Sequence, residues 1–279
     1  MLYPDHNDFI TRYTENLFDE LRENFNRCKE EINVTLVHDC RVSLRRLMAL
    51  IEVLSSLHAD EKKTLIKNRK ALKKLQKRFS PTRDVHVLKK YISDNIVSLC
   101  DSNSFLEWLT SQTANTEETL MNDLKKIKFS DILRIKDNMF RLFLKNTSEI
   151  SLTDSLFTIL DDIFLETVEK IEKLDLGNLV TFHSVRISLK RFRYTLEILN
   201  QFDSAYQMSL FDLKNLQDYL GEIQDLSVLK HTLMNCSPDL KNEFEYDCML
   251  DFINEKLTYL TNSFYNQRYE VLKLWEIKT

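Results

Sequence analysis

The sequence carries one arrangement of a histidine and basic residues twice. HDCRVSLRR begins at His38 and HSVRISLKR begins at His183, and in both segments His-x-x-Arg is followed by a basic pair. A guanidinium group donates paired hydrogen bonds to phosphate oxygens, an ammonium group adds a mobile positive charge, and an imidazole can donate from a ring nitrogen. These residue types in this pattern predict binding of phosphate-rich anions.

Both segments are expected to form helices with one basic and one apolar face. With His38 at 0° and 100° per residue, Arg41 falls at about 300°, Arg45 at about 340° and Arg46 at about 80°. The opposite face, near 200°, gathers Cys40, Leu44, Leu47, Ile51 and Leu54. In the second segment the basic side holds His183, Arg186, Lys190, Arg191 and Arg193. Its apolar side holds Val185, Leu189, Phe192, Leu196 and Leu199.

A second source of positive charge is the segment from Lys62 to Arg83, which holds ten Lys and Arg and no Asp or Glu. The whole chain has a net charge of −4, so the remainder carries −14. Solvated helices usually mix both signs, because opposite charges at i,i+4 stabilise a helix and like charges destabilise it. A one-sign helix favours a polyanionic partner, and an ordinary solvated basic face is the alternative.

The helices that must position these residues follow from the composition. The 279 residues include two Gly and three Pro, whereas average usage is about 7% and about 5%. Tight turns between strands need Gly, Asn-Gly or Pro, so sandwiches, barrels, propellers, Rossmann folds and glycine-rich phosphate loops are excluded. We predict an all-α fold, with helices near 6–33, 35–57, 60–79, 84–100, 103–126, 131–146, 152–174, 179–202, 207–221, 225–234 and 239–273.

An internal repeat predicts how the helices are organised. HDCRVSLRRLMALIEVL, from His38, matches HSVRISLKRFRYTLEIL, from His183, at an offset of 145. LKKLQKRFSPTRDVHVL, from Leu72, matches LKNLQDYLGEIQDLSVL, from Leu213, at an offset of 141. Each half alone would leave an apolar face uncovered. We therefore predict one domain over residues 1–279, with halves at about 6–150 and about 151–279 related by a pseudo-twofold axis.

The cysteines and the apolar runs bear on location. The five cysteines are odd in number, scattered and without a CxxC pair. This pattern favours a reduced, cytoplasmic compartment with all five as small core residues. No run of about 18 apolar residues is present and the N-terminal residues lack the pattern of a secretory signal. We expect no membrane partner.

Nothing in the sequence points to catalysis. HExxH, Glu-x-x-His and Cys/His ligand spacings do not occur, and no nucleophile stands beside a recognisable base. We expect no catalytic residues, no metal, no cofactor and no enzymatic activity. Asp84 and Asp225 recur in the second repeated block and are interpreted as helix N-caps or salt-bridge partners of an arginine. The neighbouring Asp161 and Asp162 are expected on the surface.

At these motifs the sequence resembles the CHAD family, the conserved histidine α-helical domain. Members of that family carry H-x-x-R-[VI]-x-x-[RK]-[RK] in each of two pseudo-symmetric halves, followed by a Lys-rich helix and an Arg-Asp-x-x-Val-Leu turn. The matching segments here are 38–46, 183–191, 83–88 and 224–229. The resemblance covers almost the whole chain and implies two four-helix-like halves around a basic central channel that binds inorganic polyphosphate without catalysis. It also implies a stand-alone module, because no β-rich triphosphate-tunnel domain is encoded.

The sequence departs from the family pattern at three places. Met48 replaces a third Arg that Arg193 retains in the second copy, and Gln224 replaces the Arg of the second turn. The second Lys-rich helix is acidic around a single Lys214. We therefore expect residues 38–46 and 62–83 to dominate binding, with 183–193 closing the other wall. The candidate polyphosphate-binding residues are His38, Arg41, Arg45, Arg46, Arg69, Lys70, Lys73, Lys74, Lys77, Arg83, His183, Arg186, Lys190, Arg191, Arg193 and Lys214.

Two other classes of function stay open at this point. Basic helices also serve RNA, so an RNA-binding or ribosome-associated protein is an alternative, although the aromatic residues do not interleave with the basic run. A phosphohydrolase or a histidine phosphotransfer protein is the second alternative, in which nearby arginines would bind the phosphoryl group. Association with polyphosphate granules follows from the leading interpretation. The oligomeric state is not predicted.

Overall fold

The computed structural model describes residues 6–143 and 149–277, and every regular element in these ranges is a helix. This confirms the all-α prediction. In chain order the elements are α1 His6–Arg27, α2 Val34–Leu57, η1 Ala59–Glu61, α3 Lys62–Arg78, α4 Ser80–Asn95, α5 Asn103–Lys125, α6 Phe129–Phe143, α7 Glu149–Glu172, α8 Leu179–Phe202, η2 Ser204–Tyr206, α9 Gln207–Asn235, α10 Pro238–Lys241, α11 Tyr246–Gln267 and η3 Arg268–Leu274.

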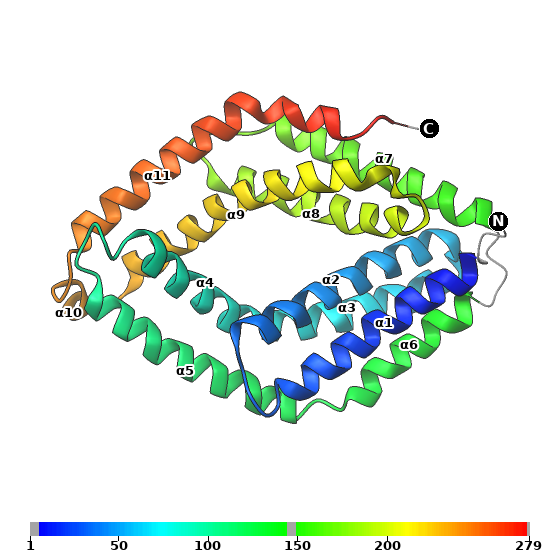
Figure 1. Ribbon diagram of the computed structural model, residues 1–279, viewed down its shortest axis with the longest axis horizontal. Coiled ribbons are helices and arrows are strands. Elements are labelled where there is room, and N and C mark those ends of the chain that lie inside the picture. Colours follow the sequence, from blue (N-terminus) through cyan, green and yellow to red (C-terminus); the bar gives the residue numbers. More distant parts are fainter. Residues whose placement is uncertain (1–5, 144–148, 278–279) are drawn as a thin grey trace.

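The two histidine-bearing helices lie side by side at the centre of a flat, elongated molecule (Figure 1). Helices α1, α3 and α6 pack around α2 on one side, and α7 and α9 pack against α8 on the other. At one end, α4 and α5 extend away from α2 while α9 and α11 extend away from α8, and α10 lies at the far tip (Figure 1). The pseudo-twofold relation of two halves stays a prediction.

Both central helices begin in the same way. Each is 24 residues long and starts after an asparagine, Asn33 for α2 and Asn178 for α8. The Asn33 side chain accepts a hydrogen bond from the backbone N–H of Leu36, and that of Asn178 accepts one from Val180. An asparagine N-cap satisfies a backbone donor that the first turn leaves free. Residues 28–33, which we expected to continue the first helix, form the turn before α2.

The apolar faces predicted for α2 and α8 lie in the hydrophobic core. All ten predicted apolar positions are at most 1% exposed, so the helical periodicity is confirmed for both segments. Aromatic rings complete the packing around α8, where Phe192 lies 5.9 Å from Phe164 and 5.6 Å from Trp275 between ring centroids. Because the apolar face of each helix is buried in the core, its opposite, basic face points away from the core.

Besides the end of the first helix, two predicted boundaries are wrong. We expected a break at 222–224, but α9 runs unbroken from Gln207 to Asn235, because that stretch has no proline and one glycine alone does not end a helix. The matching position of the first copy is interrupted, since Pro81 lies at the start of α4 and favours a new helix. The expected helix 239–273 is α10, α11 and η3 instead. The expected helix end at 144–146 lies outside the described residues.

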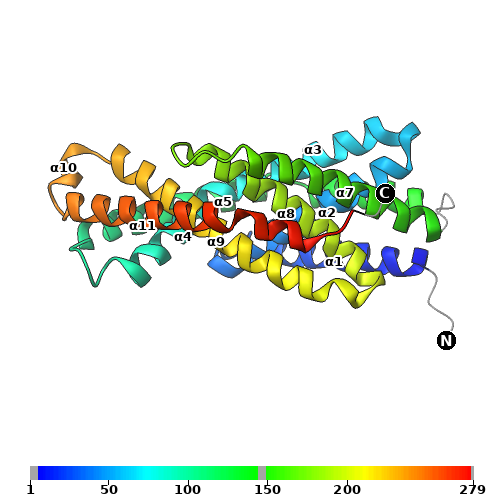
Figure 2. The ribbon, with the colours of Figure 1, turned by 90° about the horizontal axis from the view of Figure 1, so that it is seen from above.

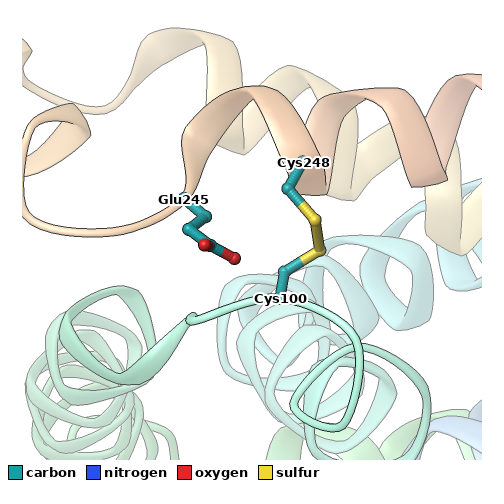
Figure 3. A group of neighbouring side chains, drawn as sticks. All are labelled: Cys100, Glu245 and Cys248. Atoms are coloured by element: carbon teal, nitrogen blue, oxygen red, sulfur yellow. A yellow bond between two sulfur atoms is a disulfide. The ribbon is translucent and has the colours of Figure 1, made fainter.

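The expectation that all five cysteines are free is wrong as well. Cys100, in the turn after α4, forms a disulfide with Cys248 in the first turn of α11 (Figure 3). Their Cα atoms are 6.0 Å apart across a sequence separation of 148 residues, which no spacing argument could have paired. Cys28, Cys40 and Cys236 are free and buried, as expected.

The pair Asp161–Asp162 is only half on the surface. Asp162 is exposed, but Asp161 is 2% exposed and accepts a hydrogen bond of 2.6 Å from Trp275 Nε1. A buried indole N–H needs an acceptor, and this bond fixes the C-terminal segment against α7.

Within the described ranges, no helix is both long and apolar enough to cross a membrane.

The disulfide should contribute measurably to stability. A cross-link that closes a loop of 148 residues restricts the unfolded chain far more than the folded one. We expect Cys100→Ser to lower the free energy of unfolding by about 2–4 kcal/mol, measured by urea unfolding in metal-free buffer. A reductant should lower the stability of the unsubstituted protein and leave Cys100→Ser unchanged. Equal sensitivity of both proteins to the reductant would contradict the bond.

Candidate functional site

A cleft of about 560 Å³ opens between the two central helices and their neighbours. Its walls come from α2 and α4 on one side and from α8 and α9 on the other. Six cationic side chains line it, three from each side: Arg41, Arg45, Arg83, Arg186, Lys190 and Arg193. The two repeated histidines, His38 and His183, line it as well. Half of the sixteen candidate residues therefore meet in one place.

The position of Arg41 is set by the junction between α3 and α4. Its Nη1 atom donates to Ser80 Oγ at 2.7 Å and to the Gln76 carbonyl oxygen at 3.4 Å. Burial and the neighbouring Arg45 lower the pKa of Arg41 to about 10, although Asp84 acts in the opposite direction. The guanidinium is thus fixed by neutral acceptors, and in the described part of the chain it forms no ion pair.

The second half contributes Arg186 and Lys190, one turn apart on α8. Burial lowers the pKa of Arg186, and its Nε atom is buried without a hydrogen-bond partner in the described part of the chain. Burial together with Arg186 and Arg45 lowers the pKa of Lys190 to about 6. Packing this many cations together is unfavourable in the free protein, and a polyanion would relieve it.

Among the described residues, two hydrogen bonds join the walls of the cleft directly. Tyr91 on α4 donates to Glu222 Oε1 on α9 at 3.3 Å. Arg45 on α2 donates to the hydroxyl oxygen of Tyr194 on α8 at 3.4 Å, and Tyr194 is 5% exposed. The guanidinium of Arg193 lies 5.2 Å from the same ring. Tyr194 therefore separates two arginines and orients one of them, a role that the sequence alone did not decide.

The two histidines differ in their surroundings. His183 Nδ1 is hydrogen-bonded to Gln224 Oε1 on α9, which leaves Nε2 as the atom available to a ligand. His38 is exposed, and loss of hydration against the cleft wall, Arg83 and Arg45 lower its pKa. A nearby polyanion would act in the opposite direction and raise it. Gln224, which replaces an Arg of the family pattern, thus orients a histidine.

Four carboxylates also line the cleft, so it is not uniformly basic: Asp84, Asp218, Glu222 and Asp225. Asp84 is the fifth residue of α4 and Asp225 lies within α9, so neither is a helix N-cap, contrary to one of our two interpretations. Burial raises the pKa of both carboxyl groups, although Arg83 and Arg186 lower it. In the described part of the chain neither carboxylate forms an ion pair, so the second interpretation, a salt bridge to an arginine, is not shown either. Both act on the arginines only as counter-charges at longer range.

Arg46 and Arg191 hold the central helices together and do not line the cleft. Arg46 on α2 pairs with Glu197 on α8 at 2.9 Å, and Arg191 on α8 pairs with Glu52 on α2. Glu52 and Glu197 occupy the same position of the predicted repeat, six residues after each arginine. Sequence reasoning missed both glutamates, although their recurrence in the two copies was a signal for them.

Glu197 also binds a residue of the cleft. Its second carboxylate oxygen accepts from Arg193 Nε at 3.1 Å, and Arg193 Nη1 donates to Gln217 Oε1 at 2.9 Å. The Glu197 carboxylate therefore belongs both to the ion pairs between α2 and α8 and to the wall of the cleft.

The lysine-rich helix α3 lies outside the cleft. Figure 2 shows it at one edge of the molecule, where its lysines face solvent. Arg69 lies 3.6 Å from Glu52. The candidates on α3 form a separate outer surface: Arg69, Lys70, Lys73, Lys74 and Lys77. Lys214 is exposed on α9 and does not line the cleft.

Comparison with known proteins identifies the family. A family model described as CHAD domain matches residues 12–234, which include the whole cleft. The chain belongs to the CHAD family. The crystal structure of the CHAD domain from the plant Ricinus communis matches with a TM-score of 0.72, at 16% sequence identity, over 99% of this chain and 94% of that chain. At this identity the likeness shows the fold alone. No curated protein matches.

In this CHAD protein the Glu197 carboxylate, which two arginines share, should contribute more to stability than a carboxylate on the surface. We expect Glu197→Gln to lower the free energy of unfolding by about 1–3 kcal/mol, because two arginines lose a charged acceptor. Chemical denaturation measures the change. The control is Glu169→Gln, which removes a solvent-exposed partner of Lys173 and should have a much smaller effect. Equal losses in both variants would mean that the ion pairs between the central helices do not stabilise the fold.

Proposed function

We propose that this CHAD protein binds inorganic polyphosphate in the cleft between α2, α4, α8 and α9. The observation that carries the proposal is the convergence of six lysine and arginine side chains and two histidines from both sides on one cleft. Four acids in the same walls reduce the attraction for a single small anion. A chain of linked phosphates can instead reach several guanidinium groups at once, each through a charge-assisted hydrogen bond.

The outer surface of α3 extends the proposed binding region. The end of α3 meets the cleft where the Gln76 carbonyl oxygen accepts from Arg41. A polyphosphate chain that leaves the cleft at this point would pass the exposed lysines of α3. Long chains should therefore bind more tightly than triphosphate, and their affinity should fall steeply with salt because counterions are displaced.

The proposed activity is binding without catalysis and without a cofactor. It would suit a cytoplasmic protein that associates with polyphosphate granules. RNA is the competing partner that the exposed lysines of α3 favour. A competition experiment separates the two: RNA that displaces long-chain polyphosphate efficiently would overturn the proposal. Release of orthophosphate from polyphosphate, or an acid-labile phosphate on His38, would instead indicate an enzyme.

The cleft arginines give the first test. We expect the double substitution Arg41→Ala and Arg186→Ala to weaken long-chain polyphosphate binding by about 100-fold or more, since each arginine contributes charge-assisted hydrogen bonds. Isothermal titration calorimetry at low salt measures the affinity, and far-UV circular dichroism checks the fold.

The matched control removes two exposed arginines that do not line the cleft, Arg22→Ala with Arg134→Ala. It should change the affinity only slightly. If the control weakens binding as much as the cleft variant does, binding is nonspecific. If replacing the α3 lysines by glutamine weakens triphosphate binding more than the cleft variant does, the cleft is not the site.

The second test is the pH dependence of binding. The pKa of Lys190 is lowered to about 6 by burial, Arg186, Arg45 and Arg41, with Asp225 opposing. A bound polyanion favours the charged lysine, so binding takes up a proton above pH 6, and affinity for long chains should fall by up to about tenfold per pH unit from pH 6 to 8. Lys190→Met should weaken binding at pH 6 and flatten the profile. A steep profile retained in Lys190→Met would contradict this origin.

A further inference from the structure

The disulfide lies in a group of three side chains that could act together. Figure 3 shows Cys100 in the turn after α4, Cys248 in the first turn of α11, and Glu245 beside them. One carboxylate oxygen of Glu245 and the two sulfur atoms lie within 4.8 Å of one another. Two of the three residues fall after residue 234, beyond the range that the CHAD model matches.

The two turns are held together by contacts other than the disulfide. The Glu245 N–H donates to the Asp101 carbonyl oxygen at 2.9 Å, and the Asp101 N–H donates to Glu245 Oε2 at 2.9 Å. Next to these bonds the rings of Phe105 and Phe244 lie 5.2 Å apart. Reduction of the disulfide would therefore leave the two thiols as neighbours.

The reduced group has the chemistry of a metal site. Two thiolates and a carboxylate form a ligand set that suits Zn²⁺, at about 2.3 Å for sulfur and about 2.0–2.2 Å for oxygen. Tetrahedral bonds of that length place two sulfurs about 3.8 Å apart, a separation that small side-chain rotations can reach from the bonded pair.

Local features prepare each ligand. Cys248 is the third residue of the 22-residue helix α11, where the helix dipole favours a thiolate. The Asp101 N–H orients the carboxylate of Glu245 through one oxygen and leaves the other for a metal. Cys100 is buried while Glu245 is exposed, so an ion could enter from the solvent side.

We propose that Cys100, Glu245 and Cys248 form a redox-gated site for a thiophilic divalent cation of the Zn²⁺ class. The reduced thiols lose their protons and bind the cation. A small-molecule disulfide oxidises the site: one thiolate attacks it and releases a small thiolate, and the second thiolate resolves the mixed disulfide and releases another. The two protein sulfurs give up two electrons, the small disulfide becomes two thiolates that take up protons from water, and the cation leaves.

The test uses the full chain without polyphosphate, so its failure is distinct from failure of the proposed function. The protein is reduced, desalted without oxygen and titrated with Zn²⁺ against a chromogenic chelator. We expect one Zn²⁺ per reduced chain and none per oxidised chain. Co²⁺ in its place should give the sulfur-to-metal charge-transfer absorption of a thiolate site. Adding a small-molecule disulfide to the loaded protein should release the metal.

Variants decide which ligands are used. Cys248→Ser and Glu245→Gln should each weaken Zn²⁺ binding at least tenfold. The controls Asp247→Asn and Cys236→Ser change a neighbouring exposed carboxylate and a free buried cysteine, and both should bind as the unsubstituted chain does. No uptake by the reduced protein, uptake unchanged in Cys248→Ser, or uptake unchanged in Glu245→Gln would each overturn the proposal.

Discussion

Two basic helices can lie side by side only if their charges are balanced where they touch. In this chain the balance comes from exchanged ion pairs, Arg46 of α2 with Glu197 of α8 and Arg191 of α8 with Glu52 of α2. The buried apolar faces on the other side of each helix fix which residues meet. Once these pairs form, the remaining cations of the two helices must face the cleft, so the site is a consequence of how the halves are joined.

In the cleft, burial disfavours the charged forms of several basic and acidic groups. Burial lowers the pKa of Lys190 to about 6 and raises the pKa of Asp84 and of Asp225, so groups of both signs are less stable in their charged forms there than in water. Such an arrangement destabilises the free protein and is characteristic of functional sites. Arg41 is held by the neutral acceptors Ser80 and Gln76 and forms no ion pair with any described residue. A ligand of high negative charge would supply the missing interactions without any change in the fold.

The sequence predicted the parts of the structure that depend on local pattern. The shortage of glycine and proline and the helical spacing gave the fold class, and the repeated motif gave the cleft cations from Arg41 to Arg193. Contacts between residues far apart in the sequence could not be predicted from it. A helical wheel places Arg191 on the polar side of its helix but cannot show that Glu52, 139 residues away, binds it. The same limit hid the disulfide and left the α3 lysines assigned to a channel that they do not line.

The walls of the cleft are far apart along the chain, with its two histidines separated by 145 residues. At ribosomal rates of about 5–20 residues per second, the first wall is made about 7–30 s before the second. During that interval α2 and the lysine-rich α3 emerge close to ribosomal RNA, and Arg191 of α8, which pairs with Glu52 in the folded protein, has not yet been made. Until α8 is made, the basic face of α2 lacks the ion-pair partner that Glu197 supplies, and its arginines are open to other anions such as RNA.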